Sequence, residues 1–438
     1  MPGHSKRTSR ESSHALLAAL SRITLAAVFA FGAACARAAP LTLDDALRLA
    51  QERSLQLTAR QASATAAREM AVAAGQRPDP TLKAGITNLP VNGADRFSPS
   101  RDFMTMRSIG VMQEFTRTGK LKTRAARFER EAEVAEAGRD LALANLQRDT
   151  ALAWLDRHYQ ERMRELLVSQ RDEARLQIDA ADAAYRGGKG SQADVFAART
   201  GVAQIEDRLA QTRQQVTTAT TQLARWVGTQ AADALAAPPP LDAVRLTDEE
   251  LDSQLAHHPQ IEVLARQEAL ARADADVAQA NKQPDVSVEL MYSQRGPAYS
   301  NMVSVNVSVP LQWDQHQRQD REVAAKLALV EQARAEREEA TRAHVAEALA
   351  MLQEWRSDRE RLARYDDSLL PLATERTRAS LAAYRGGNGL LTAVLEARRG
   401  EIDTRIERLR LEMDAARRWA WLNFLVPASM RASGAARP

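Results

Sequence analysis

A short passage with tyrosine, arginine and two glycines occurs twice in this chain. The first copy, AYRGGKGSQADVFAAR, covers residues 184–199, and the second, AYRGGNGLLTAVLEAR, covers residues 383–398. Each copy lies between two long helical patterns. The simplest role is structural: the tyrosine packs at a helix end and the arginine complements the negative end of the helix dipole. The duplication favours the alternative, that these side chains have a function for which the chain needs both copies.

Three methionines have the chemistry of a soft metal site. Met104, Met106 and Met112 are spaced so that one extended strand would place them on the same face as Ser108 and Gly110. Thioether sulfur is a weak ligand for Cu(I) or Ag(I). Methionine also fills irregular space without any chemical role. The residues alone do not decide between the two interpretations.

The other residues that could carry chemistry have the wrong neighbours. The pair His257–His258 precedes Pro259 without the spacing or companion ligands of a metal site, so we expect a solvated turn there. The run GGKGS after Arg186 lacks the preceding strand and the Gly-Lys-Ser/Thr order of a phosphate-binding loop. No nucleophile elbow, zinc motif or pair of catalytic carboxylates is recognisable. We therefore predict that the protein is not an enzyme and uses no cofactor.

Residues 1–38 have the pattern of a secretory signal peptide. A basic stretch at residues 1–10 is followed by the apolar run ITLAAVFAF and by the small-residue cleavage pattern Ala36-Arg37-Ala38. Cys35 is the only cysteine, so cleavage after Ala38 would leave no disulfide; acylation of Cys35 as a lipoprotein N-terminus is the alternative. These residues carry five basic side chains and one acidic one, so the net charge of +3 becomes about −1 without them. No nucleic-acid partner is expected.

The rest of the chain consists of two similar halves. Helical patterns start near Thr42 and Thr247, and each ends at a Pro-Asp pair, at Pro78 or Pro284. In each half two alternating segments, a very long helical pattern, the Tyr-Arg-Gly-Gly turn and another helix follow. We predict a signal peptide over 1–38, a first repeat over 39–235 (hairpin at about 80–115, turn at 186–190), a linker over 236–246, a second repeat over 247–425 (hairpin at about 286–311, turn at 385–389) and a flexible tail over 426–438.

Four segments alternate between apolar and polar residues, which predicts β-strands. The clearest one places Val303, Val305, Val307, Val309 and Leu311 opposite Met302, Ser304, Asn306 and Ser308. A strand that crosses a bilayer needs about 9–11 residues, and the smallest membrane barrels have about eight strands. Open sheet edges in lipid would leave backbone groups without partners. Insertion would therefore require association, and three chains would supply twelve strands.

The helical pattern after each hairpin is far longer than a globular domain needs. In the first half apolar residues step by three and four from about Leu121 to Tyr185, roughly 65 residues or about 100 Å of helix. Such a length suits a coiled coil or a tube that spans a compartment. In the second half Pro371 interrupts the pattern, and it should kink the helix or break one turn.

With these features together, the chain resembles the TolC family of outer-membrane efflux ducts. The matching passages are LTLDDALRLA, QERSLQL, both AYRGG turns, MRSIGVMQEFTRTGKLKTRAA and its looser counterpart VSVNVSVPLQWDQHQRQDREVAA, from Leu41 to about Leu425. The resemblance implies an α+β membrane protein built from two tandem repeats. A homotrimer would form a twelve-stranded outer-membrane β-barrel, four strands per chain, continuous with a long periplasmic α-helical coiled-coil barrel. A periplasmic adaptor, an inner-membrane efflux pump and outer-membrane lipid are the other implied partners.

The resemblance also implies a role for the repeated turns as periplasmic tips, where the tunnel meets the adaptor and closes. The implied tip residues are Tyr185, Arg186, Gly187, Gly188, Tyr384, Arg385, Gly386 and Gly387. The glycines would supply the positive φ of a tight turn between helices. Asp194 and Glu396 are the candidates for acidic residues at the closed aperture. The family often has a basic residue just after the second turn; this chain departs from it there, with Gly389 and Leu390.

The passages NLPVNG, DFMTMRSIGVMQEF and TGK look most like the heavy-metal cation efflux branch of resistance-nodulation-division systems. The expected function is passive export of metal cations, powered by the partner pump. Drug or solute export, or type I secretion, through the same duct is one alternative. A periplasmic coiled-coil adaptor or scaffold without a pore is another, and it predicts neither membrane-length strands nor a trimer.

Overall fold

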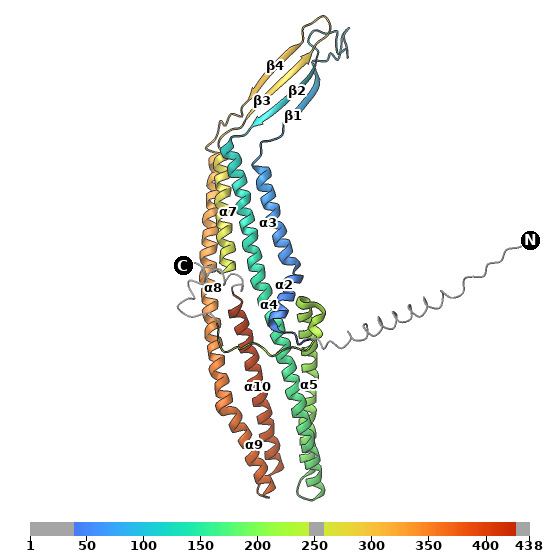
Figure 1. Ribbon diagram of the computed structural model, residues 1–438, viewed down its shortest axis with the longest axis vertical. Coiled ribbons are helices and arrows are strands. Elements are labelled where there is room, and N and C mark those ends of the chain that lie inside the picture. The colour runs from blue at the N-terminus through green and yellow to red at the C-terminus, as the bar shows by residue number, and fades with distance from the viewer. Residues whose placement is uncertain (1–38, 245–257, 426–438) are drawn as a thin grey trace, which may run out of the picture.

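A computed structural model describes residues 39–244 and 258–425. A four-stranded sheet lies at one end of an elongated molecule, and long helices run from it to two turns at the opposite end (Figure 1). This arrangement confirms the expected α+β fold class. The predicted signal peptide and C-terminal tail, the second helical start at Thr247, and His257 lie outside the described residues.

The four predicted strands are present and form one antiparallel sheet in chain order. They are β1 (Thr81–Thr87), β2 (Met106–Phe115), β3 (Val286–Gln294) and β4 (Met302–Ser308). The two hairpins, far apart in sequence, join where β2 pairs with β3. Because β4 ends at Ser308, Val309 and Leu311 lie beyond the strand on which the alternation places them.

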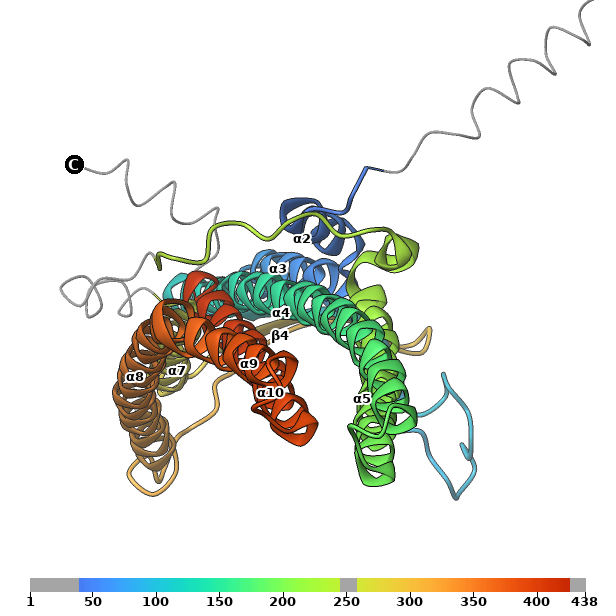
Figure 2. The same cartoon turned by 90° about the horizontal axis from the view of Figure 1, so that it is seen from below.

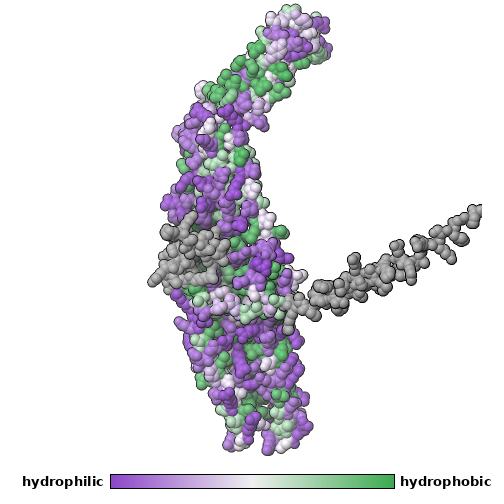
Figure 3. All heavy atoms as spheres, in the orientation of Figure 1, coloured by the Kyte–Doolittle hydropathy of each residue, from purple (hydrophilic) through white to green (hydrophobic). Residues whose placement is uncertain are grey.

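One face of the sheet is apolar and uncovered. The register aligns Leu82, Val111, Leu290 and Val305 across all four strands. Their exposed fractions lie between 48% and 70%, which is far from the burial of a core residue. The opposite face carries small and polar side chains such as Ser293. Apolar residues gather along the sheet, whereas the surface of the helices is mainly hydrophilic (Figure 3).

Long helices connect the hairpins to the turns. They are α2 (Leu43–Arg53), α3 (Leu55–Ala74), α4 (Thr118–Arg186), α5 (Gln192–Val227), the short η1 (Gly228–Ala232), α7 (Pro259–Asn281), α8 (Gln319–Arg364), η2 (Tyr365–Leu369), α9 (Leu370–Arg385) and α10 (Leu391–Asn423). The 69 residues of α4 confirm the predicted long helix. None of the helices within 39–244 and 258–425 is both long and apolar enough to cross a membrane.

Two interruptions of the helices have identifiable local causes. Ser54 separates α2 from α3, and its hydroxyl accepts a hydrogen bond from the Leu57 N–H at 3.3 Å, which starts the second helix. Pro371 follows the π-helical turn η2. Proline lacks the N–H that a regular helix would use there. The prediction that Pro371 disturbs one turn is confirmed.

The helices follow an arc when the molecule is viewed along its length (Figure 2). α2, α3 and the connection after η1 lie on the convex side, and the concave side is open. The packed core lies where this connection crosses the helices. The indole N–H of Trp154 donates to the Leu41 carbonyl at 3.1 Å, and that of Trp419 donates to the Ala243 carbonyl at 3.0 Å. The second bond holds the linker against the helical arc, and the first holds Leu41, which forms a β-bridge with Leu235 just before the linker.

The prediction of a solvated turn is wrong for His258. Its side chain is only 5% exposed, and its Nδ1 accepts a hydrogen bond from the Gln260 N–H at 3.2 Å at the start of α7. Its ring centroid lies 4.0 Å from that of His344 in α8. Burial, with a smaller effect from His344, lowers the pKa of His258 to about 3, and burial also lowers the pKa of His344.

The histidine pair should make the protein less stable in mild acid. The ordinary histidine pKa is 6.5, so below it the unfolded chain binds protons that folded His258 and His344 do not. The two histidines therefore leave the free energy of unfolding unchanged above about pH 6.5. Below that pH they lower it by at most about 1.4 kcal/mol per pH unit for each histidine. We expect the thermal unfolding midpoint to fall between pH 7 and pH 5. His258→Asn keeps a capping oxygen and should flatten this dependence, whereas the exposed His316→Asn should not; equal pH profiles in all three proteins would contradict the assignment.

Candidate functional site: two turns and the groove between them

The two Tyr-Arg-Gly-Gly passages form nearly identical turns. In the first, the Gly187 N–H donates to the Ala183 carbonyl at 3.0 Å and the Lys189 N–H donates to the Ala184 carbonyl at 2.9 Å. In the second, Gly386 donates to Ala382 at 2.9 Å and Asn388 donates to Ala383 at 3.0 Å. The duplicated sequence thus produces a duplicated backbone geometry.

Only one glycine of each pair has the left-handed conformation. Gly188 and Gly387 have φ values of +69° and +79°, whereas Gly187 and Gly386 have values of −81° and −75°. The positive φ expected of these turns is therefore supplied by the second glycine of each pair. Helical φ values are open to any residue, but the left-handed region is costly for a residue with a Cβ atom.

Alanine substitutions should separate the two glycine positions. Gly188→Ala and Gly387→Ala should each raise the free energy of the folded turn by about 1–2 kcal/mol because of the positive φ. An added Cβ would meet no atom within 4 Å, so the backbone conformation is the source of this cost. Gly187→Ala and Gly386→Ala are matched controls that should cost far less. Amide hydrogen exchange at the turns measures the difference as faster local opening. Equal exchange rates in the two sets would contradict the role of the second glycine.

The two turns lead into their next helices differently. Ser191 and Asp194 form a capping box at the start of α5: the Asp194 carboxylate accepts from the Ser191 N–H at 2.8 Å, and the Ser191 hydroxyl accepts from the Asp194 N–H at 3.2 Å. α10 starts after Leu390, which makes no such bond and is 74% exposed. Asp194 therefore stabilises a helix start, a role that its position three residues after a serine could have indicated.

The two tyrosines are also not equivalent. Tyr185 is 47% exposed, and the adjacent Arg186 forms an ion pair with Asp182 one turn earlier in the same helix. Tyr384 is half-buried and packs against a small apolar cluster that both helical hairpins supply. Val195 comes from α5 and Val394 from α10. Tyr384 is thus the member of the pair that contributes to contact between the two hairpins.

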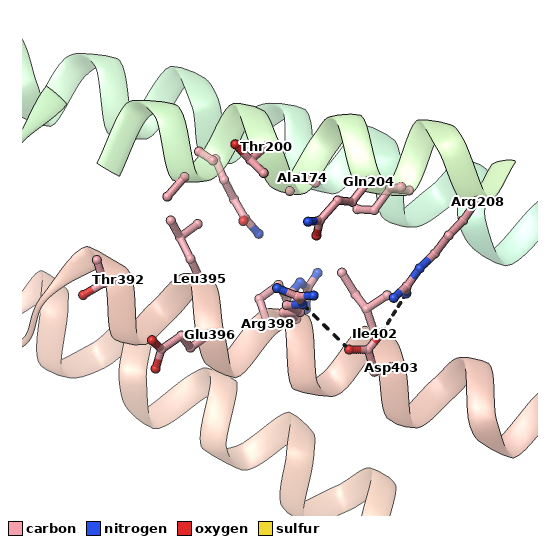
Figure 4. Close-up of a pocket in the computed structure, with 16 residues that line it drawn as sticks. Ala174, Thr200, Gln204, Arg208, Thr392, Leu395, Glu396, Arg398, Ile402 and Asp403 are labelled. Carbon is pink, nitrogen blue, oxygen red and sulfur yellow. Dashed lines mark hydrogen bonds and ion pairs between the residues drawn. The ribbon is translucent and has the colours of Figure 1, made fainter. Parts of the chain in front are cut away.

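A groove of about 330 Å³ separates α5 from α10 above the turns, and Glu396 is among its lining residues (Figure 4). Across it, the Arg208 guanidinium of α5 lies 2.7 Å from the Asp403 carboxylate of α10. Arg399 approaches the same carboxylate at 4.0 Å. These residues could not be identified from the sequence, because nothing local connects side chains 195 positions apart.

A second set of ion pairs surrounds Glu401, whose side chain is only 2% exposed. Arg398 and Arg405 lie 2.9 Å and 2.6 Å from its carboxylate. Burial acts to raise the pKa of Glu401, but a hydrogen bond with Thr377 and the nearby arginines outweigh it and lower the pKa. Arg398 also pairs with Glu173 of α4. Charged contacts thus contribute to the link between the hairpins. The partly exposed Arg208–Asp403 pair can be exchanged for water at modest cost, whereas leaving the buried Glu401 unpaired would be costly.

The methionines do not converge. Met106 and Met112 lie on the polar face of β2, six positions and therefore about 20 Å apart. Met104 precedes β2, so its assignment to the strand face is wrong; it is 47% exposed. Within 39–244 and 258–425, no group of three or more His, Cys, Asp or Glu residues is arranged to hold a metal ion. The three thioethers cannot bind one ion together.

Residues 251–426 match the family described as outer membrane efflux protein. A search of curated protein sequences gave no significant match. The match covers about two fifths of the chain, within the second half. It supports the expected outer-membrane location and the expectation of a passive channel rather than an enzyme.

Solved outer-membrane channels share the fold of nearly the whole chain. The outer-membrane channel OprN has a TM-score of 0.74 at 16% identity, covering 88% of this chain and 90% of its own. CusC, described in terms of transmembrane channel formation, has a TM-score of 0.74 at 14% identity, covering 88% and 92%. The outer membrane protein VceC of Vibrio cholerae has a TM-score of 0.71 at 18% identity, covering 87% and 95%. The chain therefore has the fold of these outer-membrane channels.

Proposed function

We propose that three copies of this chain form the outer-membrane exit duct of a tripartite efflux system. A periplasmic adaptor and an inner-membrane pump would be its partners, and conduction through the duct itself would be passive. The observation that carries the proposal is the open sheet, apolar on one face and polar on the other, at the end of an open helical arc.

The sheet has the surface chemistry of a membrane barrel segment. Its apolar face, with Val305 at 64% and Leu290 at 56% exposed, is suited to lipid contact. Its polar face would line a water-filled lumen. β1 and β4 are the two outer strands, and each pairs with only one neighbour in the described chain. In lipid such edges need partners, which neighbouring chains can supply by pairing β4 of one with β1 of the next.

The helical arc supports the same assembly. α5 and α8 lie at its two ends, and Leu327 and Leu329 of α8 are 52% and 46% exposed (Figure 2). Three such arcs would close into a tube whose inner wall is the open concave side. Because positions two apart on a helix do not share a face, one of the two exposed leucines would then be covered by the neighbouring chain, as expected for an apolar side chain at an assembly interface.

We assign the two turns to the periplasmic end of this tube, as tips that contact the adaptor and close the duct. Glu396 is exposed and lines the groove beside them, whereas the Asp194 carboxylate already serves a helix start. The ion pair Arg208–Asp403 and the Tyr384 cluster hold the two hairpins together. Opening would have to break these contacts.

The cargo that we propose is heavy-metal cations. Its support is the resemblance of the passages around NLPVNG and DFMTMRSIGVMQEF to that branch of the family, and the fold shared with CusC adds a little to it. The dispersed methionines argue against a thioether site along the path, so selectivity would come from the partner pump. Deleting the gene should make cells sensitive to metals, and the wild-type gene should restore resistance. Sensitivity to drugs or bile salts alone would contradict the metal cargo and favour solute export through the same duct.

Arginine on the apolar face should abolish membrane assembly. Val305→Arg places a charge in the middle of the proposed lipid-facing surface, at a cost of about 2–4 kcal/mol at the bilayer midplane. Ser304→Arg, the next residue on the polar face, is the matched control and should assemble. We expect trimers in outer-membrane extracts for Ser304→Arg and a strong loss for Val305→Arg. Normal trimer assembly of Val305→Arg would contradict lipid contact at this face. Absence of trimers even in the wild type would favour the scaffold alternative, in which the sheet stays out of the membrane.

Loosening the second turn should make the duct leak. Tyr384→Ala with Arg385→Ser removes the ring that packs between the hairpins, so we expect a higher single-channel conductance in planar bilayers and greater sensitivity to large antibiotics. Tyr185→Ala with Arg186→Ser is the matched control at the first turn, where the side chains face solvent or Asp182. Its effect should be smaller. Unchanged conductance of the second-turn variant would exclude its role in closure.

A further inference from the structure

A single ion pair crosses the middle of the polar face of the sheet. The Lys83 ammonium of β1 lies 3.0 Å from the Glu289 carboxylate of β3, although β2 lies between the two strands. Glu289 is the more enclosed partner, with its side chain 15% exposed against 40% for Lys83. The lysine therefore contributes to the cover of the carboxylate.

Gly110 makes this contact possible. It pairs with Lys83 on one side and with Met291 on the other, so the lysine side chain passes diagonally over the one position of β2 that has no side chain. A Cβ atom at Gly110 would also come within 2.7 Å of the Leu290 carbonyl oxygen of β3. The glycine thus permits both the close approach of the strands and the crossing of Lys83.

Other charges on this face are few. The register and the strand alternation put only Lys83, Glu289 and Glu114 there within the four described strands. Glu114 lies at the helix end of the sheet, in a hollow that Lys120 also lines, and Lys120 in turn pairs with Asp285 at 2.8 Å. The middle of the face therefore has one positive and one negative charge, and they are in contact.

We propose that Lys83 is an internal counter-ion that prevents Glu289 from attracting and holding cations in the lumen of the duct. The inference rests on the proposed trimer, in which three uncovered Glu289 carboxylates would form one ring. Rings of carboxylates make pores selective for cations and can bind divalent ions. With Lys83 in contact, each carboxylate presents a short dipole instead of a net charge, and its field in the lumen falls off quickly. Lys83 is thus a specificity-determining residue for the exit path.

The test is ion selectivity of reconstituted full-length protein. Reversal potentials in a KCl gradient give the ratio of K⁺ to Cl⁻ permeability, at about 0.1 M salt where screening extends over about 10 Å. We expect Lys83→Gln to raise this ratio about threefold and Glu289→Gln to lower it about threefold, since each leaves one uncompensated ring of charge. Added MgCl₂ should reduce the current of Lys83→Gln more than that of the wild type.

Two double variants separate charge from structure. Lys83→Gln with Glu289→Gln removes both charges, and Lys83→Glu with Glu289→Lys exchanges their positions. Both double variants keep the middle of the face neutral, so both should return the permeability ratio to the wild-type value. All proteins are also measured with Tyr384→Ala and Arg385→Ser, so that the turns do not limit the current. Channels with the wild-type ratio in every variant would overturn the counter-ion role and leave the duct intact. Absence of any channel in both backgrounds would overturn the proposed duct itself.

Discussion

The two outer strands of the sheet each present a row of backbone N–H and C=O groups with no partner among the described residues. An apolar surface covers one side of the same sheet, with Val303 and Val305 more than 60% exposed. In water, the backbone groups of the outer strands can form hydrogen bonds, but exposure of the apolar face is unfavourable. In lipid, the apolar face is favourably solvated, but the backbone groups of the outer strands have no hydrogen-bond partners. Both demands are met only if the sheet continues into other chains. The proposed assembly follows from this conflict.

The helices, like the sheet, form an open structure that other chains could complete. They form an arc whose concave side is open, and residues 233–244, which follow η1, run along its convex side (Figure 2). Near the turns, the hairpins share small apolar clusters together with ion pairs such as Arg208–Asp403. A stable core near Trp154 and Trp419 thus gives way to weaker contacts toward the tips, where a duct that opens and closes needs them.

Much of the fold could be predicted because its signals are local. Alternation along residues such as Val303 and Val305 identifies a strand without knowledge of its neighbours, and the duplicated glycines identify both turns. The features that could not be predicted depend on distant partners. His258 is buried where His344 and Leu425 lie beside it, and nothing in the sequence around it indicates this. The prediction that Met104 lies on the strand face is wrong because β2 begins two residues after it, at Met106.

Crosslinking between β1 and β4 tests the central claim most directly. Ala84 and Val303 lie three strands apart in one chain, about 14 Å, which is too far for a disulfide within it. Cys35 is the only native cysteine. We predict that Ala84→Cys, combined in turn with Val303→Cys, Val305→Cys or Val307→Cys, gives covalent products in outer membranes that end at the trimer for at least one pair. Monomers in every combination, or products that extend beyond three chains, would contradict the closed trimeric sheet.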